Sequence, residues 1–210
     1  LELTRDAADE ASTDYADVAE RLRAWEREGV LRRDPVPALY LLRQRFADPS
    51  GRELRRLGFF ASLRLEDYAS RVVLPHERTL RGPKADRLRL LRATAANLSA
   101  VFLLYEDPEA ELGPRLEAAF AAGEVASAKD DAGIEHSLAV AADPALVSAV
   151  ARFLAPRSVV IADGHHRYET ALAYAAEKQT PASSRMMVVL VSTSDPGLEI
   201  FPTHRLFRGS

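Results

Sequence analysis

The stretch Val159-Val160-Ile161-Ala162-Asp163-Gly164-His165-His166-Arg167-Tyr168-Glu169-Thr170-Ala171-Leu172 joins an apolar run to a polar cluster and a helical pattern. The four apolar residues at its start predict a buried strand that stops at Asp163-Gly164. After the cluster, one helical face carries Tyr168, Ala171, Leu172 and Ala175. The polar cluster is therefore expected where a strand ends and a helix begins. Ligands bind at this position in open α/β sheets, and a helix N-terminus offers N–H groups and partial positive charge to an anion.

The residue types of the cluster favour a phosphate as that anion. Gly164 permits a tight turn and close approach of a ligand to the backbone. Arg167 can donate two parallel hydrogen bonds to phosphate oxygens. His165 and His166 can donate to phosphate or transfer a proton near neutral pH. Asp163 is the residue of this turn that could hold Mg²⁺.

Two other interpretations of this turn remain open. In the first, Asp163 caps the helix and both histidines are solvated. In the second, the histidines bind a metal ion. Adjacent histidines point in different directions, and no third histidine or carboxylate stands at a ligand-like spacing, so the sequence disfavours the metal.

Composition bounds the class of protein. The chain has 210 residues, of which 47% are hydrophobic and 28% charged, and its net charge is −3. These values are ordinary for a globular protein and do not indicate nucleic-acid binding by the whole chain. The absence of cysteine excludes disulfides, thiolate metal sites and cysteine nucleophiles, and it suits a reducing cytoplasm. No apolar run approaches the length of a membrane span.

The first part of the chain, residues 1–70, predicts a helix and a hairpin. The helix is expected from Thr13 to Glu28, with an apolar stripe of Tyr15, Val18, Leu22 and Trp25. Strands are expected at Ala38–Phe46 and Leu54–Leu65, on either side of a turn. Gly58 within the second strand suggests a β-bulge.

The second part, residues 71–210, carries the polar box. It predicts, in order, a helix at Pro83–Asn97, a strand at Ala100–Tyr105, a helix at Pro114–Ala122, a hairpin at Lys129–Gly133, a helix with Asp143 as cap and Pro144 in its first position, and a strand at Met186–Val191. Residues 159–191 read as strand, helix and strand, and the default for such a unit is a parallel pair with a right-handed crossover. We therefore predict a mixed α/β (α+β) fold, a sheet with flanking helices, in one compact fragment of a longer protein.

Two further polar clusters are candidates for the same site. The first comprises His76, Glu77, Thr79, Lys84, Asp86 and Arg87. Glu77 could be a general base or a Mg²⁺ ligand, and Lys84 could meet a phosphate at the start of the next helix. The alternative is a charged, solvated loop. The second cluster comprises Thr203, His204 and Arg205, for which the alternative is an exposed tail.

Together these clusters resemble one family. Asp163–Ala171 resembles the signature box of an uncharacterised bacterial and archaeal family, catalogued as a domain of unknown function and often labelled SpoOJ/ParB-like. His76-Glu77-x-Thr79, the Pro83/Lys84 and Asp86-Arg87 pattern, and Pro202-Thr203-His204-Arg205 resemble other motifs of that family. The resemblance runs from about Tyr40 to Arg205.

The resemblance implies a ParB/sulfiredoxin-like sheet and a place in one superfamily with sulfiredoxin, ParB and ADP-dependent free serine kinases. Relatives bind nucleotide phosphates at a turn that Gly164, His166 and Arg167 match. Sulfiredoxin has its catalytic cysteine at the position of His165, so its reaction is excluded here. The serine kinases have an acidic catalytic residue upstream of the box, a role that we assign to Glu77 from its motif and chemistry.

The function expected from these features is nucleotide and phosphate binding, with phosphoryl transfer of the free serine kinase type. Glu77 and His165 are the predicted catalytic residues. His76, Thr79, Lys84, Arg87, the turn and Thr203–Arg205 are the predicted phosphate or nucleotide ligands. ADP, ATP and CTP are not distinguished, and the acceptor is a small hydroxyl compound. Mg²⁺ is allowed, whereas haem, flavin and zinc are not expected.

Three alternatives stay open. One is a ParB-like nucleotide-dependent switch whose output is dimer closure, another a nucleotide hydrolase, and the third a binding domain without chemistry. The sequence shows no helix-turn-helix, so nucleic acid is not an expected partner of this fragment. Neither is a membrane.

Overall fold

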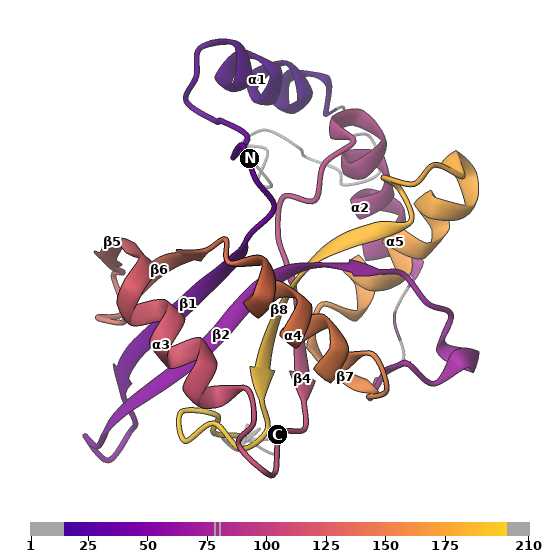
Figure 1. Cartoon of the computed structure of the whole chain (residues 1–210). Coiled ribbons are helices and arrows are strands. Elements are labelled where there is room, and N and C mark those ends of the chain that lie inside the picture. Colours follow the sequence, from indigo (N-terminus) through magenta and orange to yellow (C-terminus); the bar gives the residue numbers. More distant parts are fainter. Residues whose placement is uncertain (1–14, 78, 80, 201–210) are drawn as a thin grey trace, which may run out of the picture.

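The computed structural model describes residues 15–77, 79 and 81–200, and these form one mixed sheet with helices (Figure 1). The helices are α1 Ala16–Arg27, α2 Arg81–Thr94, α3 Gly113–Gly123, α4 Pro144–Leu154 and α5 His165–Lys178, with a 3₁₀ turn at Tyr68–Ser70. The strands are β1 Leu39–Ala47, β2 Glu53–Arg64, β3 Val73–Leu74, β4 Val101–Tyr105, β5 Glu124–Lys129, β6 Glu135–Ala141, β7 Val159–Asp163 and β8 Arg185–Ser192. The predicted mixed α/β class is confirmed.

The eight strands lie in the order β3-β7-β4-β8-β2-β1-β6-β5. The β3–β7 and β4–β8 pairs are parallel, and the other pairs are antiparallel. The predicted hairpins β1–β2 and β5–β6 are both present. Because β1 and β2 lie in the middle of the sheet, the hairpin predicted for the first part of the chain shares one sheet with the polar box.

The predicted parallel pair of β7 and β8 is wrong. Strand β4 lies between them, antiparallel to β7 and parallel to β8, so β7 and β8 run in opposite directions. The strand-helix-strand order had left no place for a third strand. Strand β4, which follows α2 in the chain, pairs with the edge of β7 where β8 was expected.

Strand β7 has a different parallel partner, the two-residue strand β3. Val73 pairs with Val159 and Leu74 with Val160, a pairing that the sequence did not predict. Both strands end at the same edge of the sheet. The loop that carries His76 and Glu77 therefore leaves the sheet beside the Asp163-Gly164 turn, at the carboxyl ends of two parallel strands.

One apolar core holds α3, α4 and α5 against the sheet. Alternate residues of the strands enter it, as the period of a β-strand requires, among them Val101, Leu103 and Tyr105 of β4. The helices contribute residues that include Leu116, Phe120, Val150, Phe153, Tyr168 and Ala171. Val160, on the opposite face of β7, is 37% exposed.

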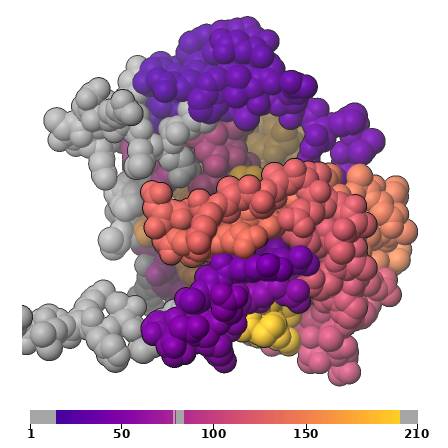
Figure 2. Space-filling model, turned by 90° about the vertical axis from the view of Figure 1, so that its left-hand side faces the viewer, coloured from indigo at the N-terminus to yellow at the C-terminus, as the bar shows by residue number. Residues whose placement is uncertain are grey.

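Helix α1 packs at one end of the molecule through a small second cluster. Tyr15 and Val18 are buried against Leu90 of α2, whereas Leu22 and Trp25 of the predicted stripe are only half buried. The Tyr15 hydroxyl donates to Asp86 of α2 at 2.8 Å. Figure 2 shows the face crossed by the β5–β6 hairpin, with α1 at one end and β1–β2 at the other.

Of two predictions made from single residues, the helix cap at Asp143 is confirmed and the bulge at Gly58 is wrong. Asp143 accepts the Ala145 N–H at 2.9 Å and caps α4, as predicted. The predicted bulge at Gly58 is wrong, because the ladder to β1 continues through this residue without a register shift, and Gly58 forms the regular last pair, with Val191, of the ladder to β8. Gly58 instead allows close packing, since a Cβ there would lie 2.8 Å from Val191 Cγ2 and 2.9 Å from the Leu190 carbonyl oxygen.

None of the helices in the described part of the chain is long and apolar enough to cross a membrane.

Gly58→Ala should therefore destabilise the sheet. The added methyl group must displace Val191 or the β8 backbone, and we expect the free energy of unfolding to fall by about 1–3 kcal/mol. Urea denaturation measures this change. Gly113→Ala is the matched control, because nothing lies within 4 Å of a Cβ at that position. Equal stability of the two variants would contradict the close-packing role of Gly58.

Candidate functional site

The Asp163-Gly164 turn joins β7 directly to α5. Gly164 has a φ of 100°, a conformation that favours glycine, and it stands at the N-cap position of α5. As a glycine it has no side chain that could accept from the first-turn N–H groups of α5. The alternative interpretation of Asp163 as the cap is therefore wrong. The first-turn amides of α5 point out of the helix without an intrahelical acceptor, as in known anion sites.

Arg167 lies against this turn. Its Nη1 donates to the Ala100 carbonyl oxygen at 2.7 Å, and its Nη2 pairs with the Asp163 carboxylate. A Cβ at position 164 would lie 2.9 Å from the Arg167 Nε, so the glycine also makes room for the guanidinium. Asp163 is 72% exposed and Arg167 25% exposed. The arginine is thus held by the protein while its carboxylate partner faces solvent.

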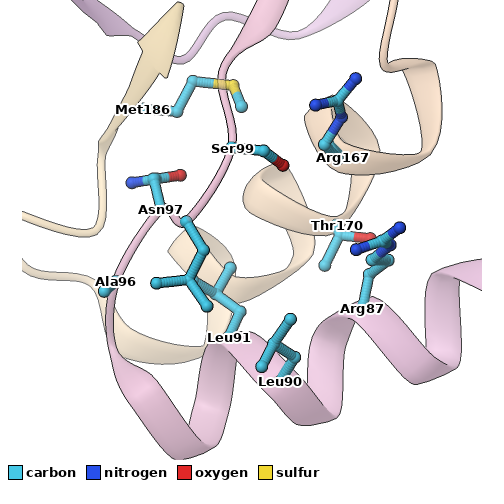
Figure 3. Close-up of a pocket in the computed structure, with 10 residues that line it drawn as sticks. Arg87, Leu90, Leu91, Ala96, Asn97, Ser99, Arg167, Thr170 and Met186 are labelled. Carbon is cyan, nitrogen blue, oxygen red and sulfur yellow. The ribbon is translucent and has the colours of Figure 1, made fainter. Parts of the chain in front are cut away.

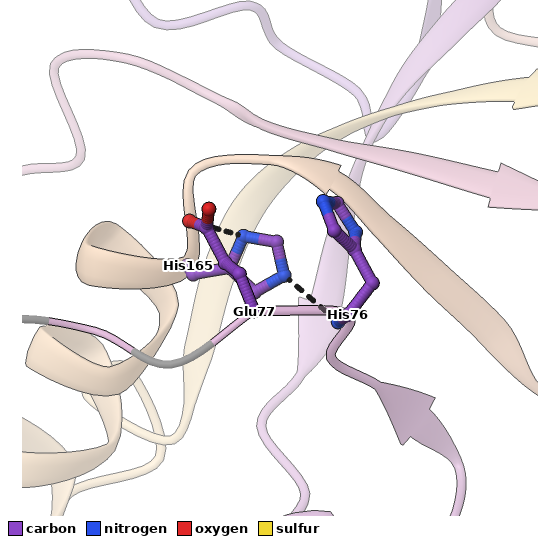
Figure 4. A group of neighbouring side chains, drawn as sticks. All are labelled: His76, Glu77 and His165. Carbon is purple, nitrogen blue, oxygen red and sulfur yellow. Dashed lines mark hydrogen bonds and ion pairs between the residues drawn. The ribbon is translucent and has the colours of Figure 1, made fainter.

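His165 is the buried member of the cluster, with 1% of its surface exposed. Its Nδ1 lies 3.0 Å from Glu77 Oε1, and its Nε2 accepts the His76 backbone N–H at 3.2 Å (Figure 4). A carboxylate only accepts and an N–H only donates, so both contacts require the neutral tautomer with its proton on Nδ1. Burial lowers the pKa of His165 below its ordinary value, and the Glu77 carboxylate opposes this effect. His165 is therefore neutral near pH 7.

His76 and Glu77 stand on the solvent side of that imidazole. One ring nitrogen of His76, Nδ1, lies 2.6 Å from the Ile161 carbonyl oxygen and must be the donor. The rings of His76 and His165 meet edge to face, with centroids 4.5 Å apart. The Glu77 side chain is 51% exposed. One possible ligand atom from each of His76, Glu77 and His165 lies within 4.8 Å of the others.

Glu169 is a site residue that the sequence analysis missed. It lies one helical turn after His165, and its Oε2 accepts from Thr79 Oγ1 at 2.6 Å and from Lys84 Nζ at 2.8 Å. Burial alone would raise the pKa of Glu169, but the hydrogen bonds from Lys84 and Thr79 outweigh it, and the net pKa is lowered. The i, i+4 spacing from His165 was the available signal.

Tyr168 anchors the opposite side of α5 to the chain before β3. Its hydroxyl donates to the Glu66 carbonyl oxygen at 2.8 Å and accepts the Glu66 N–H at 3.0 Å. Its ring stacks on Tyr68 at a centroid distance of 5.6 Å. These contacts fix the segment that leads through β3 to His76.

A small cavity adjoins the turn on the α2 side of α5. It has a volume of about 40 Å³, and Arg87, Asn97, Ser99, Arg167 and Thr170 supply its polar lining (Figure 3). A larger hollow of about 320 Å³ shares Leu91 and Asn97 with it and continues between α2 and α5 to Tyr174 and Lys178. The small cavity has room for about one water molecule, so a nucleoside could lie only in the larger hollow or on the open surface.

The fold brings most of the predicted residues to one end of α5. His76, Glu77, Thr79 and Lys84 contact His165 or Glu169, and Arg87 shares a cavity with Arg167. His166 is half buried in the first turn, where its carbonyl oxygen accepts from Thr170. The remaining predicted residues, Thr203, His204 and Arg205, lie outside the described residues.

Comparison with known proteins gives a family but no activity. The model of the family described as "Protein of unknown function (DUF1015)" matches residues 1–210. The chain belongs to this family. No curated protein matches it, and no solved structure does. The relation to ParB, sulfiredoxin and the serine kinases thus stays a prediction.

The Glu169 pair predicts a pH-dependent contribution to stability. The pKa of Glu169 is lower in the folded state than its ordinary 4.5. Its stabilisation is therefore complete above about pH 4.5 and is lost as the pH falls through the folded-state pKa. Glu169→Gln should lower the free energy of unfolding by about 1 kcal/mol at pH 7 and by less near pH 3. Urea denaturation at both pH values tests this.

Glu177→Gln is the matched control, because Glu177 also joins α5 to α2, through the more exposed Arg92. We expect it to cost less stability at pH 7 than Glu169→Gln. A larger cost for Glu177→Gln would contradict the importance of the Lys84–Glu169 contact.

Proposed function

We propose that this chain binds the phosphate of a nucleotide or another phosphorylated small molecule at the N-terminus of α5. The observation that carries the proposal is the combination of Gly164, which begins α5 without a side-chain cap, and the Arg167 guanidinium packed against it. The helix supplies backbone donors and partial positive charge, and the arginine supplies a full charge.

The ion pairs of Arg167 and Lys84 determine the charge that an incoming anion would meet. Arg167 is paired with Asp163, so an anion must replace that carboxylate. Because Asp163 is 72% exposed, it can turn into water without losing buried contacts. Lys84 is held by Glu169, and its charge is largely neutralised before any ligand arrives. Arg167, beside the turn, and Arg87, which lines the same small cavity, place two cations on the α2 side of α5.

We further propose phosphoryl transfer to a small hydroxyl compound, with Glu77 as general base. Its half-exposed carboxylate can reach a substrate, while the contact with His165 Nδ1 holds it beside α5. His165 has both nitrogens engaged and is 1% exposed, so it positions Glu77 more readily than it transfers a proton itself. Charge neutralisation and positioning would supply most of the rate enhancement.

Arg167→Ala should weaken phosphate or nucleotide binding. The loss of a charge-assisted contact is worth about 1.5–3 kcal/mol, or about tenfold to a hundredfold in Kd. A thermal-shift panel of ADP, ATP, CTP and inorganic phosphate, with and without Mg²⁺, identifies the ligand first. A ligand at a hundred times its Kd adds about 2.7 kcal/mol of stability. Titration of that ligand then measures the variant.

Arg27→Ala, at an exposed arginine of α1, is the control and should leave the Kd unchanged. If no member of the panel stabilises the chain, or if both variants bind alike, the phosphate site at α5 is wrong.

Glu77→Gln separates binding from catalysis. The substitution keeps the size of the side chain but removes the base, so we expect unchanged ligand affinity and loss of phosphoryl transfer. Glu177→Gln, at the other end of α5, should retain the parent rate. Transfer by the Glu77→Gln variant at the parent rate would rule out this role, and ligand binding with no transfer by the parent chain would reduce the proposal to a binding site.

A further inference from the structure

We infer that His76, Glu77 and His165 form a binding site for a divalent first-row transition metal ion such as Zn²⁺. The inference goes beyond the proposed function and does not rest on it, because it concerns the apo chain and a metal alone. Among the described residues, these three form a group of nitrogen and oxygen ligands close enough for one ion.

The geometry of the group is near that of a three-ligand site. One ligand atom from each residue lies within 4.8 Å of the others. Ligands about 2.0–2.2 Å from a tetrahedral ion stand about 3.4 Å apart, so closure requires movements of about 1 Å. His76 and Glu77 are both exposed and belong to a loop, so their side chains can make this movement. His165 is fixed at the start of α5 and sets the position of the ion.

The His76 ring is already oriented as a metal ligand. Its Nδ1 donates to the Ile161 carbonyl oxygen at 2.6 Å, which leaves the lone pair on Nε2. Metal-binding histidines typically donate their second nitrogen to a carbonyl or carboxylate in this way, because the contact fixes both tautomer and ring orientation. Here the acceptor is a backbone atom of β7, the strand that leads into His165.

The contact between Glu77 and His165 places a proton where the ion would bind. The ion would displace the proton between His165 Nδ1 and Glu77 Oε1, which are 3.0 Å apart, and the imidazole would then carry its proton on Nε2. The His76 N–H contact to Nε2, at 3.2 Å the longest in the cluster, would be given up as the loop closes. The exchange thus breaks both hydrogen bonds of the His165 ring, the one to Glu77 and the one from the His76 N–H, and forms three metal–ligand bonds.

The ligand types select the class of ion. Two imidazoles and one carboxylate suit zinc, iron, cobalt or nickel, whereas Mg²⁺ prefers an all-oxygen set. Three protein ligands leave at least one coordination position for solvent or substrate, as in catalytic zinc sites. A base and a metal ligand are alternative uses of the Glu77 carboxylate, so a metal titration also decides between them.

The test is a titration of the untagged, chelator-treated chain with Zn²⁺ by calorimetry, and with Co²⁺ by visible absorption, both without nucleotide. We expect one ion per chain and no competition from excess Mg²⁺. His76→Ala and Glu77→Gln change exposed side chains, so circular dichroism should show that both fold. Loss of a residue that only supports a metal ligand weakens metal binding roughly tenfold to hundredfold. Because His76 and Glu77 would be direct ligands, each variant should weaken Zn²⁺ binding by more than this.

His136→Ala is the matched control, since His136 also pairs with a carboxylate, Asp130, at 3.0 Å but lies on the β5–β6 hairpin. It should bind Zn²⁺ as the parent does. The inference is overturned if the parent binds no Zn²⁺ or Co²⁺, if His136→Ala removes binding, or if His76→Ala and Glu77→Gln both bind as the parent does. Because no phosphate is present, these outcomes leave the proposed phosphate binding at α5 untouched and bear only on the use of Glu77 as a general base.

Discussion

The imidazole of His165 connects the two segments from which the site is built. Its Nε2 accepts the His76 N–H and its Nδ1 donates to Glu77, so one buried ring holds a loop to the start of α5. A buried polar ring costs free energy unless both nitrogens have partners, and here both do. The short parallel pair of β3 and β7 brings the partners within reach, and Tyr168 anchors the chain that leads into β3. Any ligand at this end of α5 meets a surface whose shape depends on these contacts.

Opposite charges in this region are arranged in pairs. Arg167 is held by Asp163 and Lys84 by Glu169, while Glu77 faces a neutral imidazole. The described part of the site therefore does not offer unpaired positive charge to an incoming anion. Binding of an anion has to exchange an exposed carboxylate for the ligand, and binding of a metal ion has to move the His165 proton from Nδ1 to Nε2. Phosphate binding and metal binding therefore use different atoms of one region, the amides and guanidinium on one side of the turn and the imidazoles and Glu77 on the other, whereas a general base and a metal ligand would compete for Glu77.

The sequence predicted the strand–turn–helix unit because its signals are local. An apolar run, a glycine and a helical periodicity all lie within fourteen residues, and the structure has β7, Gly164 and α5 there. It did not predict the neighbours of β7, because strand pairing joins segments that are far apart in the sequence, and β4 pairs with the edge of β7 where β8 was expected. The two-residue strand β3 is too short to leave a periodic signal. Gly58 suggested a bulge, whereas its cause is a close approach of β8 that only the assembled sheet contains.

The sequence by itself determined the fold class, the position of the polar turn between a strand and a helix, and the residue types of that turn. Only the tertiary structure decided which of those residues meet. Local spacing offered no third ligand for His165, since its partners His76 and Glu77 stand 89 and 88 positions earlier in the chain. The parallel pairing of β3 with β7 removes that separation, because strands that run the same way end at the same edge of the sheet. A backbone pairing of two residues thus creates a cluster that no sequence spacing reveals.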